Sequence, residues 1–126
     1  MEMRLEHVNV TVPDPKTCAA VLCEVFGWHV RWEGEAKDQG FTVHVGDADS
    51  YLALYAPNAE LQPMGNTYVR VGGFNHVGVV VDDLAATEAR VKAAGFEPHS
   101  HGDYEPGTRF YFDGPHGIEF EVVHYD

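Results

Sequence analysis

TRFYFDGPHGIEFEVVHY, residues 108–125, contains two runs in which apolar and polar residues alternate. Between the two runs lies DGPHG, residues 113–117, whose glycines and proline are typical of a turn. Alternation on both sides of such a turn predicts two half-buried strands that pair as a β-hairpin. The rest of the chain can be interpreted by asking what this hairpin packs against.

The two faces of the predicted hairpin differ in character. Tyr111 shares a face of the first strand with Arg109 and Asp113, because side chains in a strand repeat every second residue. On the second strand Glu119 and Glu121 share a face. A carboxylate that faces the interior costs free energy unless it is paired or binds a metal, so Glu121 needs a partner. The other faces are apolar and consist of Phe110, Phe112, Ile118, Phe120 and Val122.

Composition and charge restrict the class of protein. The chain has 126 residues, enough for one domain, with 44% hydrophobic and 22% charged residues, which is ordinary for a soluble globular protein. Its formal net charge of −12, with only eight Lys and Arg, argues against nucleic acid, an anionic membrane surface or a highly anionic substrate as partner. The sequence contains neither a signal-like apolar segment nor an apolar run long enough for a membrane span, so we expect a cytoplasmic protein.

The first half of the chain predicts a strand, a helix and three further strands. Residues 5–12 alternate strictly between apolar and polar side chains. Asp14 can cap a helix that has Pro15 at its first position and stops at Gly27. Further strands are expected at residues 28–32, 41–45 and 51–55.

The same order begins again in the second half. A strand is expected at residues 75–81, a helix from Leu84 to Ala94, and then strands that end in the terminal hairpin. His7 and His76 are 69 residues apart, and Gly27 and Gly95, which follow the two helices, are 68 apart. A nearly constant offset predicts a duplicated unit.

The predicted fold class is therefore α+β, with two tandem β-α-β-β-β modules in a single domain that spans residues 1–126. The first module covers residues 1–57 and the second covers residues 74–126. Residues 58–73, which contain Pro63 and Gly65, are expected to link them.

The repeat singles out a set of equivalent positions. His7 and His76 fall at the starts of the two first strands, while the offset relates Glu121 to Ala53. Two neutral imidazoles and one carboxylate that face a common cavity would bind a divalent ion such as Fe²⁺ or Mn²⁺ and leave open positions for substrate and water. The alternative is two hydrogen-bonded strand histidines and a solvated glutamate.

Two other side chains are candidates for catalysis. Tyr111 lies on the same hairpin face as Glu121 and could hydrogen-bond a substrate oxygen, or it could be a wall aromatic. His101 is expected in the loop before the hairpin, where it could act as an acid or base or have no role. Glu119 faces inward by the same parity and could be a second base or a solvated rim carboxylate.

These features resemble the vicinal oxygen chelate superfamily, which includes glyoxalase I, extradiol dioxygenases and bleomycin-binding proteins. The likeness covers essentially the whole chain, with a histidine in each first strand and the closing FYFDGPHGIEFEVV. It implies that the modules curl into a cup that holds a divalent metal on His7, His76 and Glu121, with Fe²⁺ or Mn²⁺ favoured and Ni²⁺ or Zn²⁺ possible. It also implies a homodimer, with the cup built within one chain or shared between two.

The resemblance points to a reaction class as well. Extradiol dioxygenases have a tyrosine ten residues before the glutamate and a Pro-x-Gly turn between them, as Tyr111, Pro115, Gly117 and Glu121 do here. Glyoxalase I has a metal-binding carboxylate where this chain has Ala53. We therefore expect a metal-dependent enzyme acting on a small oxygen-chelating substrate, as a ring-cleaving dioxygenase or a lyase.

The alternative function is a bleomycin-resistance type protein that binds a small molecule without catalysis. Four aromatic side chains could line its groove, although packing in the core or at an interface would also account for them: Trp28, Trp32, Tyr51 and Tyr55.

Overall fold

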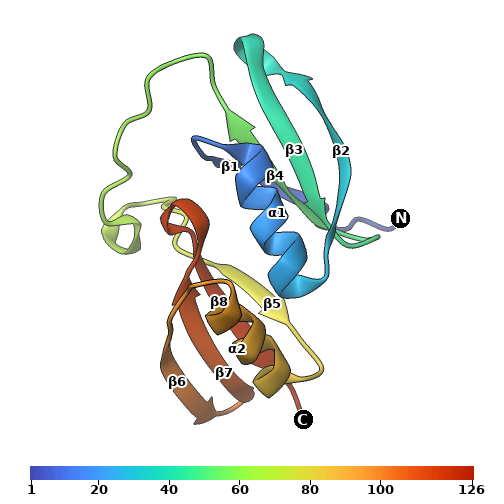
Figure 1. The fold of residues 1–126 in the computed structure, drawn as a ribbon, viewed down its shortest axis with the longest axis vertical. Helices are drawn as coiled ribbons and strands as arrows, with labels where there is room; N and C mark the ends of the chain where they lie inside the picture. Colours follow the sequence, from blue (N-terminus) through green and yellow to red (C-terminus); the bar gives the residue numbers. More distant parts are fainter. The chain divides into compact units, whose positions relative to one another are not determined.

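The computed structural model describes all residues from Met1 to Asp126. The chain divides into two compact units, Met1–Gln62 and Pro63–Asp126. Each unit contains one α-helix and a four-stranded mixed sheet, so the fold is α+β as predicted (Figure 1). The boundary between the units falls inside the predicted linker, residues 58–73.

The first unit carries a sheet in the order β1-β4-β3-β2. Strands β1 and β4 are parallel, whereas β3 is antiparallel to both of its neighbours. The elements are β1 (His7–Thr11), α1 (Pro15–Phe26), β2 (His29–Ala36), the short helix η1 (Lys37–Gln39), β3 (Gly40–Gly46) and β4 (Tyr51–Ala56).

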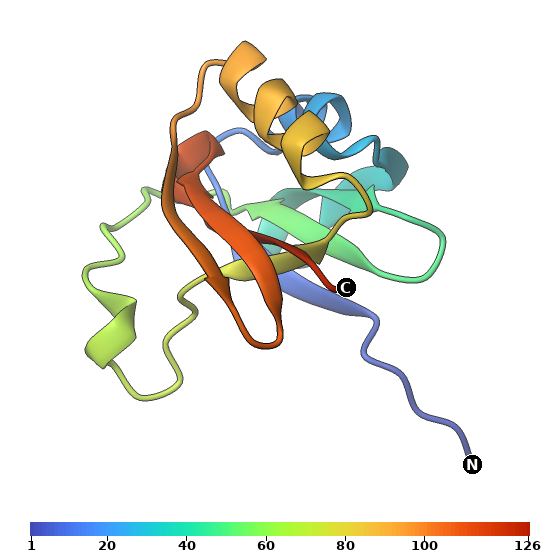
Figure 2. The same cartoon turned by 90° about the horizontal axis from the view of Figure 1, so that it is seen from below.

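The second unit repeats this arrangement in the order β5-β8-β7-β6, again with the outer pair β5 and β8 parallel. Figure 2 shows the terminal hairpin in orange to red. The elements are η2 (Thr67–Val69), β5 (Val77–Val80), α2 (Leu84–Ala93), β6 (Pro98–Tyr104), β7 (Gly107–Asp113), η3 (Pro115–Gly117) and β8 (Glu119–His124).

Both helices begin where the sequence predicts. Asp14 caps α1 by accepting a hydrogen bond from the backbone N–H of Thr17 at 3.2 Å, and Gly27 ends the helix in the left-handed region at φ 70°. Asp83 caps α2 in the same way, accepting from the N–H of Ala86 at 3.0 Å.

The terminal hairpin has the predicted faces. Tyr111 lies opposite Glu121 and Asp113 lies opposite Glu119. On the reverse face Phe110, Phe112 and Phe120 are completely buried. The hairpin therefore contributes one face to the core of the second unit and presents its polar face on the other side.

Strand β2 is longer than predicted. The sequence indicates an edge strand at residues 28–32, but pairing with β3 continues to Ala36, opposite Gly40. The added segment, residues 33–36, has little apolar alternation because it lies at the sheet edge and is largely exposed. Its backbone hydrogen bonds to β3, which the pattern of side chains does not reveal, extend the strand.

Strand β6 includes His101, so the predicted loop position of this histidine is wrong. The pairing of β6 with β7 shifts between His99 and Gly102, and Ser100 in this irregular segment has a φ of 55°. A β-bulge of this kind changes the face to which the following side chains point. His99 and His101 therefore lie on different faces of β6, although they are two residues apart.

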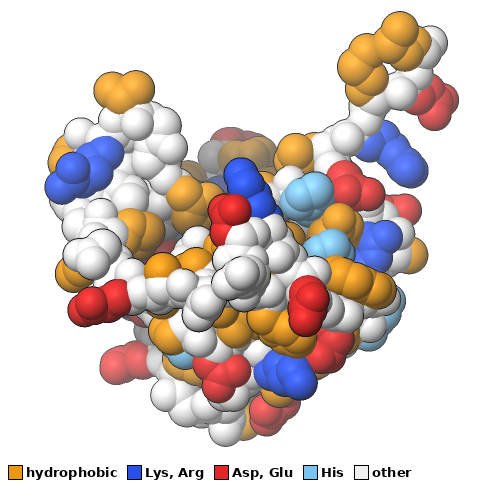
Figure 3. Space-filling view, turned by 90° about the horizontal axis from the view of Figure 1, so that it is seen from above, with side chains coloured by type: hydrophobic (Ala, Val, Ile, Leu, Met, Phe, Trp, Pro, Cys, Tyr) orange, Lys and Arg blue, Asp and Glu red, His pale blue; other side chains and the backbone are white.

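Neither helix has the length and apolar character needed to cross a membrane. The surface agrees with the net charge of −12, since acidic side chains appear on several separate parts of the face in Figure 3.

Candidate metal centre

His76 and Glu121 meet on the polar face of the second sheet. His76 directly precedes β5, and Glu121 lies in the neighbouring strand β8. The imidazole Nε2 is 3.2 Å from Glu121 Oε1. The side chains are 28% and 15% exposed, so the pair is partly sheltered from water. Two of the three predicted metal ligands are thus in direct contact.

Arg109 occupies the other oxygen of the same carboxylate. Its Nη1 donates to Glu121 Oε2 at 2.8 Å, and its Nη2 donates to the backbone carbonyls of Tyr104 and Gly107. The hydrogen bond to Glu121 raises the pKa of the Arg109 guanidinium, against the effect of burial. Arg109 therefore fixes the orientation of Glu121 and leaves Oε1 directed to His76.

Aromatic side chains border this pair. Tyr111 packs edge-on against the His76 ring, with ring centroids 5.7 Å apart. Burial and then the negative charge of Glu121 raise the pKa of the Tyr111 hydroxyl. Its phenol is therefore a proton donor at neutral pH, as the expected role toward a substrate oxygen requires.

Tyr68, from η2, extends the network to Glu119. Its hydroxyl donates to Glu119 Oε1 and lies 3.4 Å from His76 Nδ1. The hydrogen bond to Glu119 raises the pKa of Tyr68 to about 12. Glu119, whose role the sequence leaves open, is thus held close to His76 rather than free at the rim.

His7, the third predicted ligand, lies at the start of β1 in the first unit. Its Nδ1 is 2.8 Å from Glu6 Oε1, and its ring stacks on Tyr51 with centroids 4.9 Å apart. A histidine that donates from Nδ1 to a carboxylate keeps Nε2 free as a ligand atom, an arrangement common at metal sites. Its participation with His76 and Glu121 stays a prediction.

A pocket of about 490 Å³ lies on the sheet of the first unit next to His7. Ala53, the repeat equivalent of Glu121, is in its wall, and His44 lies directly opposite Ala53 in the strand pairing. Burial lowers the pKa of His44, so its ring is neutral at pH 7. The lining residues are His7, Asn9, Ala36, Lys37, Asp38, Thr42, His44, Tyr51, Ala53 and Tyr55.

His101, the candidate acid or base, lies away from this face. Its Nε2 is 3.1 Å from Glu88 of α2, and its ring stacks on the buried Phe110. Phe110 belongs to the helix side of the sheet, whereas Tyr111 and Glu121 lie on the other side. His101 therefore does not share a face with the His76–Glu121 pair.

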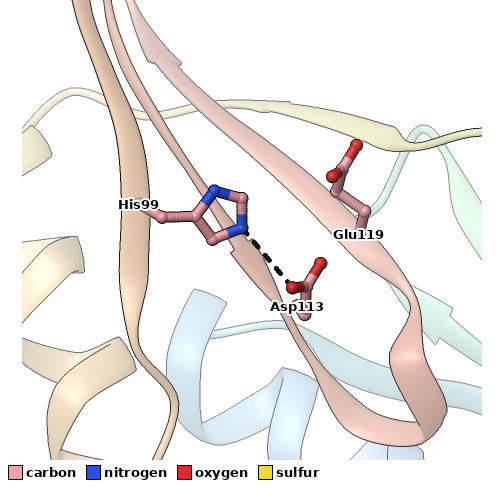
Figure 4. A group of neighbouring side chains, drawn as sticks. All are labelled: His99, Asp113 and Glu119. Atoms are coloured by element: carbon pink, nitrogen blue, oxygen red, sulfur yellow. Dashed lines mark ion pairs between the residues drawn. The ribbon is translucent and has the colours of Figure 1, made fainter.

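A second group of potential ligands lies beside this pair. One ligand atom from each of His99, Asp113 and Glu119 falls within 4.8 Å of the others. Figure 4 shows the His99 ring reaching from β6 toward Asp113, with Glu119 alongside on β8. His99 could not be selected from the sequence, because its position depends on the β6–β7 pairing.

The sequence assigned no role to three other residues that contact or line the candidate sites: Arg109, His44 and Tyr68. The role of Arg109 as partner of Glu121 could have been predicted, because the two-residue alternation places both side chains on the same face of the hairpin. His44 lies on the same strand face as Thr42, which also lines the pocket of the first unit, but the second half of the chain has no equivalent histidine that would single it out. Tyr68 lies in the segment between the modules, where no periodic pattern gives its direction.

Comparison with known proteins places these features in context. Residues 4–122 match the family model of the "Glyoxalase/Bleomycin resistance protein/Dioxygenase superfamily". An ethylmalonyl-CoA/methylmalonyl-CoA epimerase from Cereibacter sphaeroides is 29% identical over 108 residues, which cover 83% of this chain and 81% of that protein.

Two solved structures illustrate the likeness in fold. A glyoxylase/bleomycin resistance protein/dioxygenase domain from Frankia sp. EAN1pec matches with a TM-score of 0.83 at 17% identity, over 100% of both chains. A mutant of the fosfomycin resistance protein FosX from Listeria monocytogenes, complexed with Mn(II) and 1S,2S-dihydroxypropylphosphonic acid, matches with a TM-score of 0.71 at 17% identity. That match covers 98% of this chain and 93% of the other. At such identities the likeness concerns the fold.

Proposed function

This chain belongs to the glyoxalase/bleomycin resistance protein/dioxygenase superfamily, and we propose that it is a divalent-metal-dependent enzyme acting on a small substrate that offers two adjacent oxygens. The observation that carries the proposal is the 3.2 Å contact between His76 Nε2 and Glu121 Oε1 on a sheltered face. We assign the metal ligands to His76, Glu121 and His7, the last from the same chain or from a partner protomer.

The side chains fit such an ion. When two ligand atoms bind the same ion, each at about 2.1 Å, and the ligand–metal–ligand angle is about 90° to 110°, the two atoms lie about 3.0 to 3.4 Å apart. The observed 3.2 Å falls within that range. Arg109 holds Glu121 Oε2, which favours binding through Oε1 alone and keeps further positions free for substrate. A bound ion would supply a Lewis acid that polarises a substrate carbonyl.

The neighbouring side chains then have defined tasks. Tyr111 donates a hydrogen bond to a substrate oxygen, because the raised pKa keeps its hydroxyl protonated. Glu119, close to His76 and bonded by Tyr68, can accept a proton from a carbon next to the carbonyl. Tyr111 and Glu119 lie on β7 and β8 of one sheet, so a substrate bound over this face can meet both.

Among the reactions that a metal ion together with Tyr111 and Glu119 could catalyse, we favour proton transfer at a carbon next to a carbonyl, as in an epimerase. The relative from Cereibacter sphaeroides is named for that reaction and is matched over most of its length. A ring-cleaving dioxygenase with His101 as its acid or base receives less support, because His101 is bonded to Glu88 on the helix side of the sheet. His101 has no part in the proposed chemistry.

The test is proton exchange at the substrate carbon. Protein loaded with Mn²⁺ or Co²⁺ is incubated in D₂O with the methylmalonyl thioester of N-acetylcysteamine, which lacks the highly anionic coenzyme A that the net charge of −12 disfavours. Deuterium at the acidic carbon is measured by mass spectrometry. We expect exchange well above the rate without protein, and its loss in His76→Ala and Glu119→Gln. Glu97→Gln, which changes an exposed carboxylate directly before β6, is the matched control.

Other outcomes separate the alternatives. Oxygen consumption with a panel of catechols on Fe²⁺-loaded protein, without exchange at any carbonyl substrate, would select the dioxygenase. Neither exchange nor oxygen uptake by fully metal-loaded protein would contradict an enzymatic function of either kind.

The second candidate function is that of a small-molecule binding protein. It is favoured by the aromatic side chains that line the pocket of the first unit. Tyr51 packs against both His7 and His44, with its ring centroid 4.9 Å and 4.5 Å from theirs. Outside the lining residues of this pocket, the Trp32 ring lies 5.3 Å from that of His44. Flat stacked rings suit a planar apolar ligand. Tight binding of an aromatic antibiotic by metal-free protein, weakened by Tyr51→Ala, would support this function.

A further inference from the structure

The polar face of the second sheet has a local excess of negative charge. Asp113 and Glu119 lie directly opposite each other across β7 and β8, on the same face. Like charges in directly opposed positions destabilise a sheet. The ion pairs of these carboxylates are to histidines alone: Asp113 with His99 at 3.6 Å, and Glu119 with His76 at 3.8 Å. The nearby Arg109 is committed to Glu121.

His99 has the position and chemistry of a metal ligand. Its Nε2 is buried and has no hydrogen-bond partner, and it points toward Asp113 (Figure 4). Its Nδ1 lies 2.8 Å from the Ser100 hydroxyl. The tautomer that donates from Nδ1 to Ser100 leaves a lone pair on Nε2 for a cation. A second neighbour orients the ring, which stacks on Tyr111 with centroids 6.4 Å apart.

The backbone explains why His99 faces this way. The pairing of β6 with β7 shifts after His99, and the shift directs His101 to the opposite side of the sheet. Bulges often direct a side chain to a functional site. His99 itself precedes the bulge and pairs with Tyr111, so it lies on the same face as Tyr111, beside the two carboxylates.

We propose that His99, Asp113 and Glu119 form a second divalent-cation site, separate from the His76–Glu121 pair, and that an ion bound there removes Glu119 from its role as proton acceptor. One imidazole and two carboxylates suit a borderline ion such as Zn²⁺ or Mn²⁺. The ligand atoms already lie within 4.8 Å of one another, so small side-chain movements bring them to bonding distance. The ion neutralises the opposed carboxylates and connects β6, β7 and β8 beside the terminal turn.

The experiment counts ions per chain in chelator-treated protein that has been reloaded with Zn²⁺ and dialysed. We compare wild type with His99→Ala, Asp113→Asn and His76→Ala, and use Glu97→Gln as the control for loss of an exposed carboxylate. Asp113 is 67% exposed, so its substitution should leave the fold intact. We expect His99→Ala and Asp113→Asn each to weaken one zinc-binding step by at least about tenfold, whereas His76→Ala retains that step.

A thermal readout supports the count. Zn²⁺ that binds only the folded protein raises the melting temperature, and we expect the part due to this site to be absent from Asp113→Asn. A zinc ion that is still bound by His76→Ala but no longer bound by His99→Ala would support the second site, even if the protein lacks the proposed enzymatic activity. Zinc binding unchanged in both His99→Ala and Asp113→Asn would overturn the proposal. So would the loss of one and the same zinc ion in His76→Ala and His99→Ala.

Discussion

Arg109 and Glu121 form an ion pair on the polar face of the second sheet, with Nη1 donating to Oε2 at 2.8 Å. Both side chains are largely buried, at 9% and 15% exposure. The pair fixes one oxygen of the proposed metal ligand and leaves the other for His76. The carboxylate of Glu121 therefore has two positively charged or proton-donating neighbours, which accounts for its location inside the fold.

Replacing Arg109 by Met should destabilise the protein by about 3 kcal/mol, because the change leaves the buried charge of Glu121 without its partner. Urea unfolding in the presence of a chelator measures this effect without a contribution from metal. The double variant Arg109→Met/Glu121→Gln should recover much of the loss. A single variant as stable as the wild type would show that the pair contributes little.

Replacing Glu6 by Gln should weaken binding of the proposed metal about tenfold, since Glu6 accepts from His7 Nδ1 and orients its ring. The hydrogen bond to His7 lowers the pKa of Glu6, so the carboxylate is charged at neutral pH. Titration with Mn²⁺ by calorimetry gives the affinity, and Glu2→Gln in the exposed N-terminal segment is the matched control. Equal affinities for both variants would contradict this orienting role.

Stability should fall in alkaline solution in a way that depends on Tyr68. Its pKa is raised from 10.0 to about 12 in the folded protein by the hydrogen bond to Glu119. Between these pH values the folded state retains a proton that the unfolded state releases, so this stabilisation is complete below pH 10 and disappears toward pH 12. Urea unfolding across this range should show a shallower decline for Tyr68→Phe. Parallel declines would mean that the hydrogen bond does not persist.

The N-cap of α2 should be worth about 1 kcal/mol, because Asp83 satisfies the N–H of Ala86. Asp83→Ala should lower the free energy of unfolding by that amount. The adjacent Asp82→Ala removes the same charge without the cap and should have a much smaller effect. Equal losses in the two variants would assign the effect to charge rather than to capping.

Much of this fold follows from local patterns in the sequence. Alternation in the terminal stretch gives both strands of the hairpin and the face shared by Tyr111 and Glu121. Asp14 and Gly27 mark the ends of the first helix because capping depends on neighbouring residues. The nearly constant offset between the halves predicts the repeated order of elements, which the two sheets confirm.

Other parts of the candidate site depend on pairings that no local pattern records. The bulge in β6 makes His99 and His101 point to opposite faces. The two-residue alternation of a regular strand therefore does not predict the face of His101, the candidate acid or base. Tyr68 reaches Glu119 from an irregular segment. The Arg109–Glu121 pair was accessible by parity, but the search for a partner of Glu121 considered only histidines.

The most direct test of the central claim is the number of Mn²⁺ ions bound tightly per chain in wild type, His76→Ala and Glu121→Gln, with His29→Ala as the control for an exposed histidine. We expect His76→Ala and Glu121→Gln each to bind about one ion fewer than the wild type, while the control is unchanged. Folding of each variant is checked by circular dichroism. Undiminished Mn²⁺ binding in folded His76→Ala and Glu121→Gln would contradict the proposed metal centre.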